Sequence, residues 1–418
     1  MSAPPAVGRT ARAAAPHAPS APSGPRPWTR ADTVRTTLAA VVVVGLLVLA
    51  AWLHTSPWGP RGGVSLLVGT ALGIAFERGR FCFWCIFREG IEDRNTRGAY
   101  PLLVALAVGA TGYALVLGLF LPDPHAGRLP PEAHVGPVGW PLVLAGLVFG
   151  LGMALSGGCV SAHLYRLGQG HTRAVPALVG VLLGFGVGFA TWNAIYLAGV
   201  SRAPTPWLPA WLGYGGALAV TLGVLALLAA LLLRHAPPLR AREHAPMTLP
   251  KVRDAIVRWR WSAGVTGTVV GLAGVFAYLR VEPLGVTSQL GSASRTALAG
   301  TGLLPERLTG LDTLAGCATA VVQTLTENGW LVIGLVVASF AAALAGGRFR
   351  PTRLTARGAS SALLGGVLLG WGAMTALGCT VGVLLSGISA FAVSGWVFAA
   401  SCLAGVWAGI RLRVHRLT

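Results

Sequence analysis

The feature that most constrains the fold is a series of long apolar runs separated by short, arginine-rich segments. A helix that spans a bilayer needs about 20 mostly apolar residues. Only 11% of the residues are charged, against about 25% in a typical soluble domain. This contrast excludes an ordinary soluble enzyme and predicts an all-α polytopic membrane protein in the lipid bilayer. The ten expected spans are residues 36–53, 62–77, 100–121, 140–158, 174–199, 210–233, 261–280, 329–346, 361–378 and 391–410.

The net charge of +19 suggests nucleic acid at first sight. We predict no nucleic-acid partner, because the cations lie in loops between apolar runs, where they set topology. With a cytoplasmic N-terminus and ten crossings, 26 of the 32 cations lie inside. The positive-inside rule therefore predicts a multi-pass protein of the bacterial inner membrane with both termini in the cytoplasm.

The chain divides into segments with different composition. Residues 1–35 are rich in Ala, Pro, Ser and Arg and predict a disordered basic tail. The apolar run after this tail is too long for a signal peptide, so we expect a retained additional span. The expected organisation is a tail at 1–35, an extra span at 36–53, a first half at 54–233, a cytoplasmic basic linker at 234–260, a second half at 261–412 and a cytoplasmic tail at 413–418.

The two halves share a glycine pattern. Gly150-x-Gly152 leads to Gly158-Cys159, and Gly370-x-Gly372 leads to Gly378-Cys379 at the same spacing. The predicted topology places the first Gly-Cys at the cytoplasmic side and the second at the outer side. This is the pattern of an inverted-topology repeat, in which spans two to five match spans seven to ten.

Four segments beside apolar spans mix Gly or Pro with small polar residues and interrupt the helical pattern. They are residues 77–85, 156–163, 282–289 and 378–387. Short or Gly-interrupted spans at matching places in two halves indicate a transport site. Re-entrant half-helices there would direct backbone N–H groups at the centre, which suits an anion. The candidate path residues are Cys82, Cys159, Cys379, Gly158, Gly378, Ser156, Thr380, Thr287 and Ser288.

The cysteines fit neither a disulfide scaffold nor a metal site. Most lie at the ends of apolar segments, and Cys82-x2-Cys85 has no second pair at zinc-binding spacing. We expect no metal and no cofactor. A thiol is small and polarizable, and it can contact a sulfur-bearing solute as a weak donor or acceptor. Whether Cys82 or Cys85 lines the path stays open, and we interpret Cys317 and Cys402 as structural.

Three of these segments carry a resemblance to a known family. Gly79-Arg80-Phe81-Cys82, Ser156-Gly157-Gly158-Cys159 and Leu377-Gly378-Cys379-Thr380 resemble the cysteine motifs of the YeeE/YedE family of sulfur transport membrane proteins, over about residues 62–412. The resemblance implies inverted repeats whose re-entrant loops meet at a constriction. It also implies that the three cysteines pass thiosulfate by thiol–sulfur hydrogen bonds, with Cys159 at the centre.

We therefore predict a permease, not an enzyme, for uptake of thiosulfate or a related small sulfur-containing anion. The resemblance implies a possible partner, a small cytoplasmic sulfur carrier of the TusA type. Two alternatives stay open. One is a membrane sulfurtransferase or redox enzyme that uses Cys82 and Cys85 as a reactive pair. The other is a transporter of a different solute, such as a selenium compound, in which the cysteines are structural.

Overall fold

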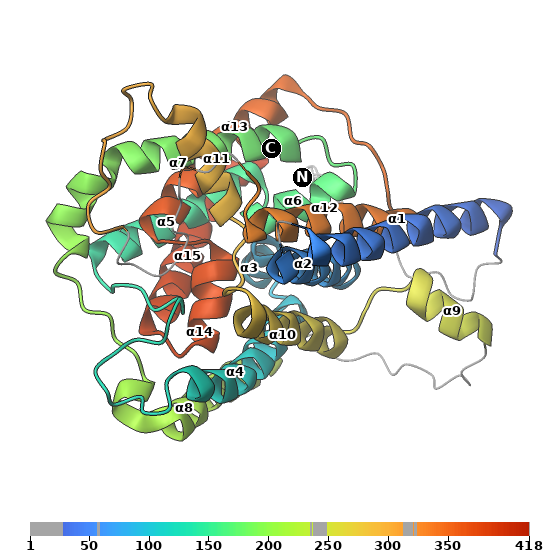
Figure 1. The fold of residues 1–418 in the computed structure, drawn as a ribbon. Helices are drawn as coiled ribbons and strands as arrows, with labels where there is room; N and C mark the ends of the chain where they lie inside the picture. Colours follow the sequence, from blue (N-terminus) through green and yellow to red (C-terminus); the bar gives the residue numbers. More distant parts are fainter. Residues whose placement is uncertain are drawn as a thin grey trace, which may run out of the picture.

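The computed structural model describes residues 28–56, 59–234, 236, 249–311, 321 and 324–417. This part of the chain is helical and holds no β-strand (Figure 1). Most of the basic tail, much of the linker and Cys317 lie outside the described residues. The helices are α1 Arg30–Thr55, α2 Gly59–Gly79, α3 Phe83–Glu92, α4 Tyr100–Phe120, α5 Trp140–Ser156, α6 Val160–Gly168, α7 Ala174–Ile195, α8 Pro209–Leu233, α9 Leu249–Val257, α10 Ala263–Arg280, α11 Ser288–Leu298, α12 Glu327–Ala345, α13 Ala356–Thr375, α14 Gly387–Ser389 and α15 Val393–Arg411. Short helical turns lie at η1 Arg97–Ala99, η2 Tyr196–Val200, η4 Thr380–Ser386 and η5 Val414–Leu417.

The prediction of a polytopic helical membrane protein is confirmed. Among the described residues, eight helices are long and apolar enough to cross a membrane, or nine if the pair bent by 45° between α13 and the segment Thr380–Ser389 counts as one span. The expected ten spans are reached only when α2 is included. This helix has 21 residues, but Arg61 near its start and Glu77 and Arg78 near its end shorten its apolar stretch.

Large apolar side chains remain exposed along several of these helices. Leu115 and Leu119 on α4 are 73% and 72% exposed, and Leu197 and Trp211 are also exposed. An apolar surface on this scale indicates contact with lipid rather than with water. Helices α1 and α8 are the least buried of the candidate spans, so they lie at the periphery.

Helix packing follows a pattern that recurs between the two halves. Helix α12 packs on α2 as α4 packs on α10, and α7 packs on α13 as α15 packs on α5. The short helices follow the same rule, because α11 contacts α7 and α3 contacts α15. Helices α1 and α8 stand outside the pattern: α1 lies along α2 and α12 (Figure 1), and α8 contacts α4. This recurrence is expected if spans two to five (α2, α4, α5 and α7) correspond to spans seven to ten (α10, α12, α13 and α15), because each contact between two helices then recurs between their counterparts.

Glycines allow the central helices to approach closely. A Cβ atom added at Gly366 on α13 would lie 2.1 Å from the carbonyl oxygen of Ala177 on α7. One added at Gly370 would lie 2.1 Å from the carbonyl oxygen of Val181. Without a hydrophobic driving force between helices in lipid, small residues of this kind provide the packing contacts that hold spans together.

The segments predicted to be cytoplasmic meet at one face of the protein. Polar contacts join Asp32 to Arg258, Glu77 to Arg348, Gln169 to Glu77, Thr172 to Thr352 and Glu92 to His415. The predicted outer segments meet elsewhere, for example where the Val138 N–H donates to the Pro204 carbonyl at 2.8 Å. These contacts show which loops lie together, and the side of the membrane that each group faces stays a prediction.

One predicted boundary needs correction. The first span begins at Arg30, so residues 30–35 belong to α1 and not to the tail. The reason is a capping box: the Thr29 side chain accepts from the Asp32 N–H while the Asp32 carboxylate accepts from the Thr29 N–H. The linker 234–260 also contains a short helix, α9. Arg253 on this helix and Arg258 just after it lie over the Trp28 ring.

Candidate functional site

Four short helical segments begin at the predicted breaks, and three of them begin directly after a cysteine. Cys82 is the N-cap of α3, Cys159 of α6 and Cys379 of η4, while Thr287 is the N-cap of α11. The first N–H groups of a helix have no partner inside the helix, and the macrodipole makes this end positive. Four such ends favour a negatively charged ligand.

The backbone makes the same turn before each of these cysteines. Arg80, Gly157 and Leu377 each lie two residues before a cysteine and have φ values of 53°, 80° and 60°. A left-handed residue ends a helix and redirects the chain. Only Gly157 has the residue type that this conformation favours, so residue type indicates the left-handed backbone at one of the three predicted breaks and not at the other two.

The cysteine sulfur atoms and neighbouring hydroxyl groups form a buried series. The Cys159 thiol lies beside the Cys82 thiol and the Thr380 hydroxyl, and its Sγ is 3.2 Å from Ser161 Oγ. The Cys379 thiol lies beside the Thr287 hydroxyl. Cys82, Cys159 and Cys379 are all 0% exposed. The structure therefore brings Cys82 and Cys159 together in the buried interior, with the Thr380 hydroxyl of the second half next to Cys159.

The other candidate residues lie at the turns where the helical spans are interrupted. The Ser156 hydroxyl donates to the Gly158 carbonyl at 3.0 Å and lies 3.1 Å from His163 Nε2, so these groups hold the first Gly-Cys turn. A Cβ added at Gly378 would lie 2.9 Å from Val383 Cγ2, which leaves no room for a larger residue. Ser288 is the first residue of α11 and is half-buried.

A cavity of about 610 Å³ opens beside the cysteines on the face where the predicted cytoplasmic segments meet. Among the described residues that line it, Glu89 is the one acid. The cations in its wall are Arg80, Arg97, Arg166, Arg173 and Arg260. Burial, followed by the charge of Arg348, lowers the pKa of Arg260 to about 10, so Arg260 stays charged at neutral pH. The cavity is therefore strongly electropositive.

Arg166 links this cavity to the cysteines, and sequence reasoning missed it. Its Nη2 donates to Cys85 Sγ at 3.1 Å and to Cys82 Sγ at 3.7 Å, and its Nη1 donates to the Gly157 carbonyl at 2.6 Å. The structure also separates the roles of the two neighbouring cysteines. Cys82 faces Cys159, whereas Cys85 lines the cavity. The available sequence signal was an arginine seven residues after Cys159, on the helix that the Gly-Cys turn begins.

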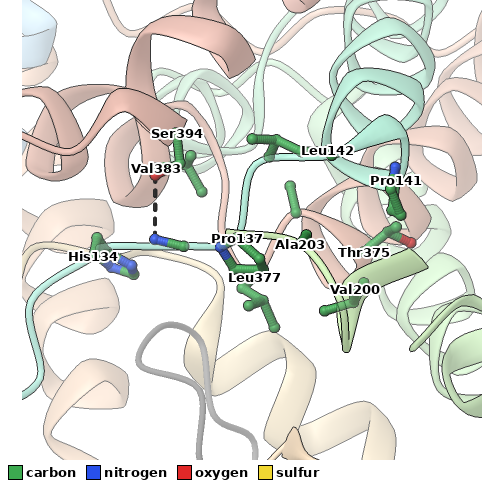
Figure 2. Close-up of a pocket in the computed structure, with 13 residues that line it drawn as sticks. His134, Pro137, Pro141, Leu142, Val200, Ala203, Thr375, Leu377, Val383 and Ser394 are labelled. Carbon is green, nitrogen blue, oxygen red and sulfur yellow. Dashed lines mark hydrogen bonds between the residues drawn. The ribbon is translucent and has the colours of Figure 1, made fainter. Parts of the chain in front are cut away.

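A much smaller pocket lies between the loop at 134–141 and the end of α13 (Figure 2). Figure 2 shows His134, Pro137, Leu377 and Val383 around it, and the Gly136 N–H donates to Ser394 Oγ at 3.2 Å. Its volume of about 20 Å³ leaves room for about one water molecule. This pocket borders the segment before Cys379, and the described residues that line it include no arginine, in contrast to the larger cavity.

Cys402 and the possible metal ligands among the described residues add no second centre. Cys402 is buried on α15, which packs on α5, as expected for a structural residue. Within the described ranges, no group of three His, Cys, Asp or Glu side chains is placed to hold a metal ion.

Together, the fold and the site define a polytopic helical membrane protein with a thiol-lined centre beside an electropositive cavity. Residues 78–408 match the family model described as Sulphur transport, and the chain belongs to this family. It is 30% identical to the thiosulfate transporter TsuA of Escherichia coli, over 82% of this chain and 92% of that protein. It is 26% identical to TsuA of Spirochaeta thermophila, over 82% and 96%. A shorter match, 30% identical over 33% of this chain, is to the probable transporter YedE of Escherichia coli. The predicted family is confirmed, and the chain is a membrane transporter of sulfur compounds.

Proposed function

We propose that this protein takes up thiosulfate, or a closely related sulfur anion, across the bacterial inner membrane. The observation that carries the proposal is the meeting of thiols at helix N-termini: Cys82, Cys159 and Cys379 each cap a short helix, and Cys159 lies beside groups from both halves. The similarity to two thiosulfate transporters, at 30% and 26% identity, supports this substrate class.

The mechanism that we propose is a series of weak binding steps. The N–H groups of the half-helices favour the anionic oxygens, and each thiol offers a hydrogen bond to the terminal sulfur. Conduction needs sites that bind the ion favourably and still release it, and thiols and backbone N–H groups are weak partners of this kind. Sulfate has no terminal sulfur, so the thiols would distinguish the two ions.

The packing pattern supports an inverted-topology repeat with re-entrant half-helices. Under the charge-based topology, both termini and the arginine-lined cavity face the cytoplasm. The cavity is then the exit, and a small cytoplasmic sulfur carrier of the TusA type would receive the sulfur there. In this proposal the permeation step itself is transport and not catalysis.

The decisive experiment is uptake of labelled thiosulfate into proteoliposomes, with unlabelled sulfate in excess as competitor. We expect uptake that resists sulfate, that is lost in Cys159→Ala and that persists in Cys402→Ala, a matched removal of a buried thiol outside the series. Normal uptake by folded Cys159→Ala protein would overturn the thiol series. Absence of uptake by folded wild-type protein would favour another sulfur or selenium solute.

A further inference from the structure

Cys85 differs from the other cysteines in its surroundings. Of the five cysteines that the structure describes, Cys82, Cys159, Cys379 and Cys402 are buried, and Cys85 alone is partly exposed. It lies in the wall of the arginine-lined cavity rather than in the buried series. A solute in this cavity therefore reaches the Cys85 sulfur without entering the buried series.

Arg166 gives this thiol an unusual partner. The Arg166 guanidinium contacts the Cys85 sulfur at 3.1 Å, and no ion pair among the described residues joins Arg166 to a carboxylate. A largely buried cation needs a negative partner, because burial removes its hydration. A thiolate at Cys85 supplies that charge, and a neighbouring arginine is one of the environments in which thiols become reactive.

The wall of the arginine-lined cavity can also bind an anion beside Cys85. Arg80, Arg173 and Arg260 line the cavity together with Arg166, and a guanidinium binds a sulfur oxyanion through paired charge-assisted hydrogen bonds. The cavity volume of about 610 Å³ accommodates a small dianion with water. The site thus combines an accessible nucleophile with cations that hold the rest of the molecule.

We propose that Cys85 accepts the outer sulfur of thiosulfate inside this cavity. The inference rests on the proposed function for its substrate and adds a chemical step to it. The Cys85 thiolate attacks the outer sulfur, a new S–S bond forms at Cys85, and the S–S bond of thiosulfate breaks. Sulfite leaves with the electron pair of that bond, and a persulfide remains on Cys85. The charges balance, because a thiolate and a dianion become a persulfide anion and sulfite, and no external oxidant is needed.

The transferred sulfur then has a defined fate. A persulfide on Cys85 carries its sulfur in the wall of the cavity, where an acceptor thiol that enters from the cytoplasm can attack it and restore the cysteine. The reaction that consumes the product is therefore sulfur transfer to an acceptor thiol. Sulfite is released on the same side as the second product.

The test uses purified full-length protein in detergent and thiosulfate that is radiolabelled in its outer sulfur. After removal of free label, we expect label bound to wild-type protein, released by dithiothreitol, together with an equimolar amount of sulfite. Peptide mapping should place the label on Cys85. Cys85→Ser should lose the label and the sulfite, while Cys402→Ala should keep both. Arg166→Gln should slow labelling by at least tenfold while Cys85 remains present.

Wild-type protein that takes up thiosulfate in proteoliposomes but retains no label and releases no sulfite would overturn the proposal without affecting the transport proposal. Label that maps to another cysteine would also overturn it. If label and sulfite appear in protein that does not transport, the sulfur-accepting step stands and the transport proposal fails. Because the wild-type protein decides these outcomes, misfolding of a variant does not obscure them.

Discussion

The Glu77 carboxylate and the Arg348 guanidinium form a bidentate ion pair that joins the two halves of the protein. Arg348 Nε lies 2.6 Å from Glu77 Oε1, and Nη2 lies 2.8 Å from Oε2. Glu77 lies near the end of α2 and is fully buried, and Arg348 lies after α12. Arg348 also donates to the Arg258 carbonyl at 2.8 Å, so the pair anchors the linker to the same face.

We predict that Glu77→Gln destabilises the protein by about 3 kcal/mol, because it removes the buried carboxylate that pairs with the half-buried guanidinium of Arg348. Arg78 and Arg260 lie 3.8 Å and 3.7 Å from the same carboxylate, so the substitution also leaves neighbouring cations to repel one another. The measurement is the free energy of unfolding in detergent by chemical denaturation.

Glu92→Gln provides the matched control. Glu92 contacts Arg88 at 3.6 Å and His415 at 3.0 Å, and its side chain is 32% exposed. Solvent screens such a pair, so we expect a loss below about 1 kcal/mol. Equal losses in the two variants would show that the Glu77 pair has no special role.

Gly370→Ala tests the close packing of α7 and α13. The added Cβ would meet the Val181 carbonyl oxygen at 2.1 Å, so the helices must separate. We expect a loss of about 2 kcal/mol from overpacking. The control is Gly223→Ala on α8, where nothing lies within 4 Å of an added Cβ. There the helix should gain up to about 1 kcal/mol. A similar loss at both positions would contradict the packing argument.

Labelling of Cys85 tests the orientation in the membrane. Because Cys85 is the partly exposed thiol in the cavity, a membrane-impermeant maleimide should modify it from the cytoplasmic side only. The experiment compares inside-out vesicles with right-side-out vesicles in a Cys317→Ala background, since Cys317 lies outside the described residues. Cys85→Ser in that background should stay unlabelled. Labelling of right-side-out vesicles alone would reverse the predicted topology.

The helices and their breaks were predictable because both depend on local sequence. Apolar runs determine the spans, and Gly-Cys steps mark the turns before Cys159 and Cys379. The contacts of Arg166 and Glu77 were not predictable, because they join positions 84 and 271 residues away along the chain. A charged residue beside an apolar run looks like a topology signal, and only the fold shows that Arg166 reaches a thiol. The position of Cys85 was open for the same reason, since one helical turn separates it from Cys82.

Glu282 gives the transport proposal a pH dependence. It lies just after α10 on the predicted outer side, and burial together with the charges of Glu327 and Glu132 raises its pKa to about 7, with Arg61 acting in the opposite direction. Below this pH the carboxyl group is neutral in the folded protein, and above it the group is charged. A third negative charge beside Glu327 and Glu132 would repel an incoming anion. Uptake into proteoliposomes should therefore fall as the outer pH rises through about 7.

The folding stability of the protein should also fall as the pH rises. The pKa of Glu282 is raised on folding, so the folded protein binds a proton that the unfolded chain releases, and stability falls as the pH rises from about 4.5 to about 7. Glu282→Gln mimics the neutral form and should flatten both profiles across this range. Glu306→Gln, a change at another acid of the same predicted outer segment, should leave both slopes in place. A Glu282→Gln protein whose uptake still falls with the wild-type slope would show that another group titrates.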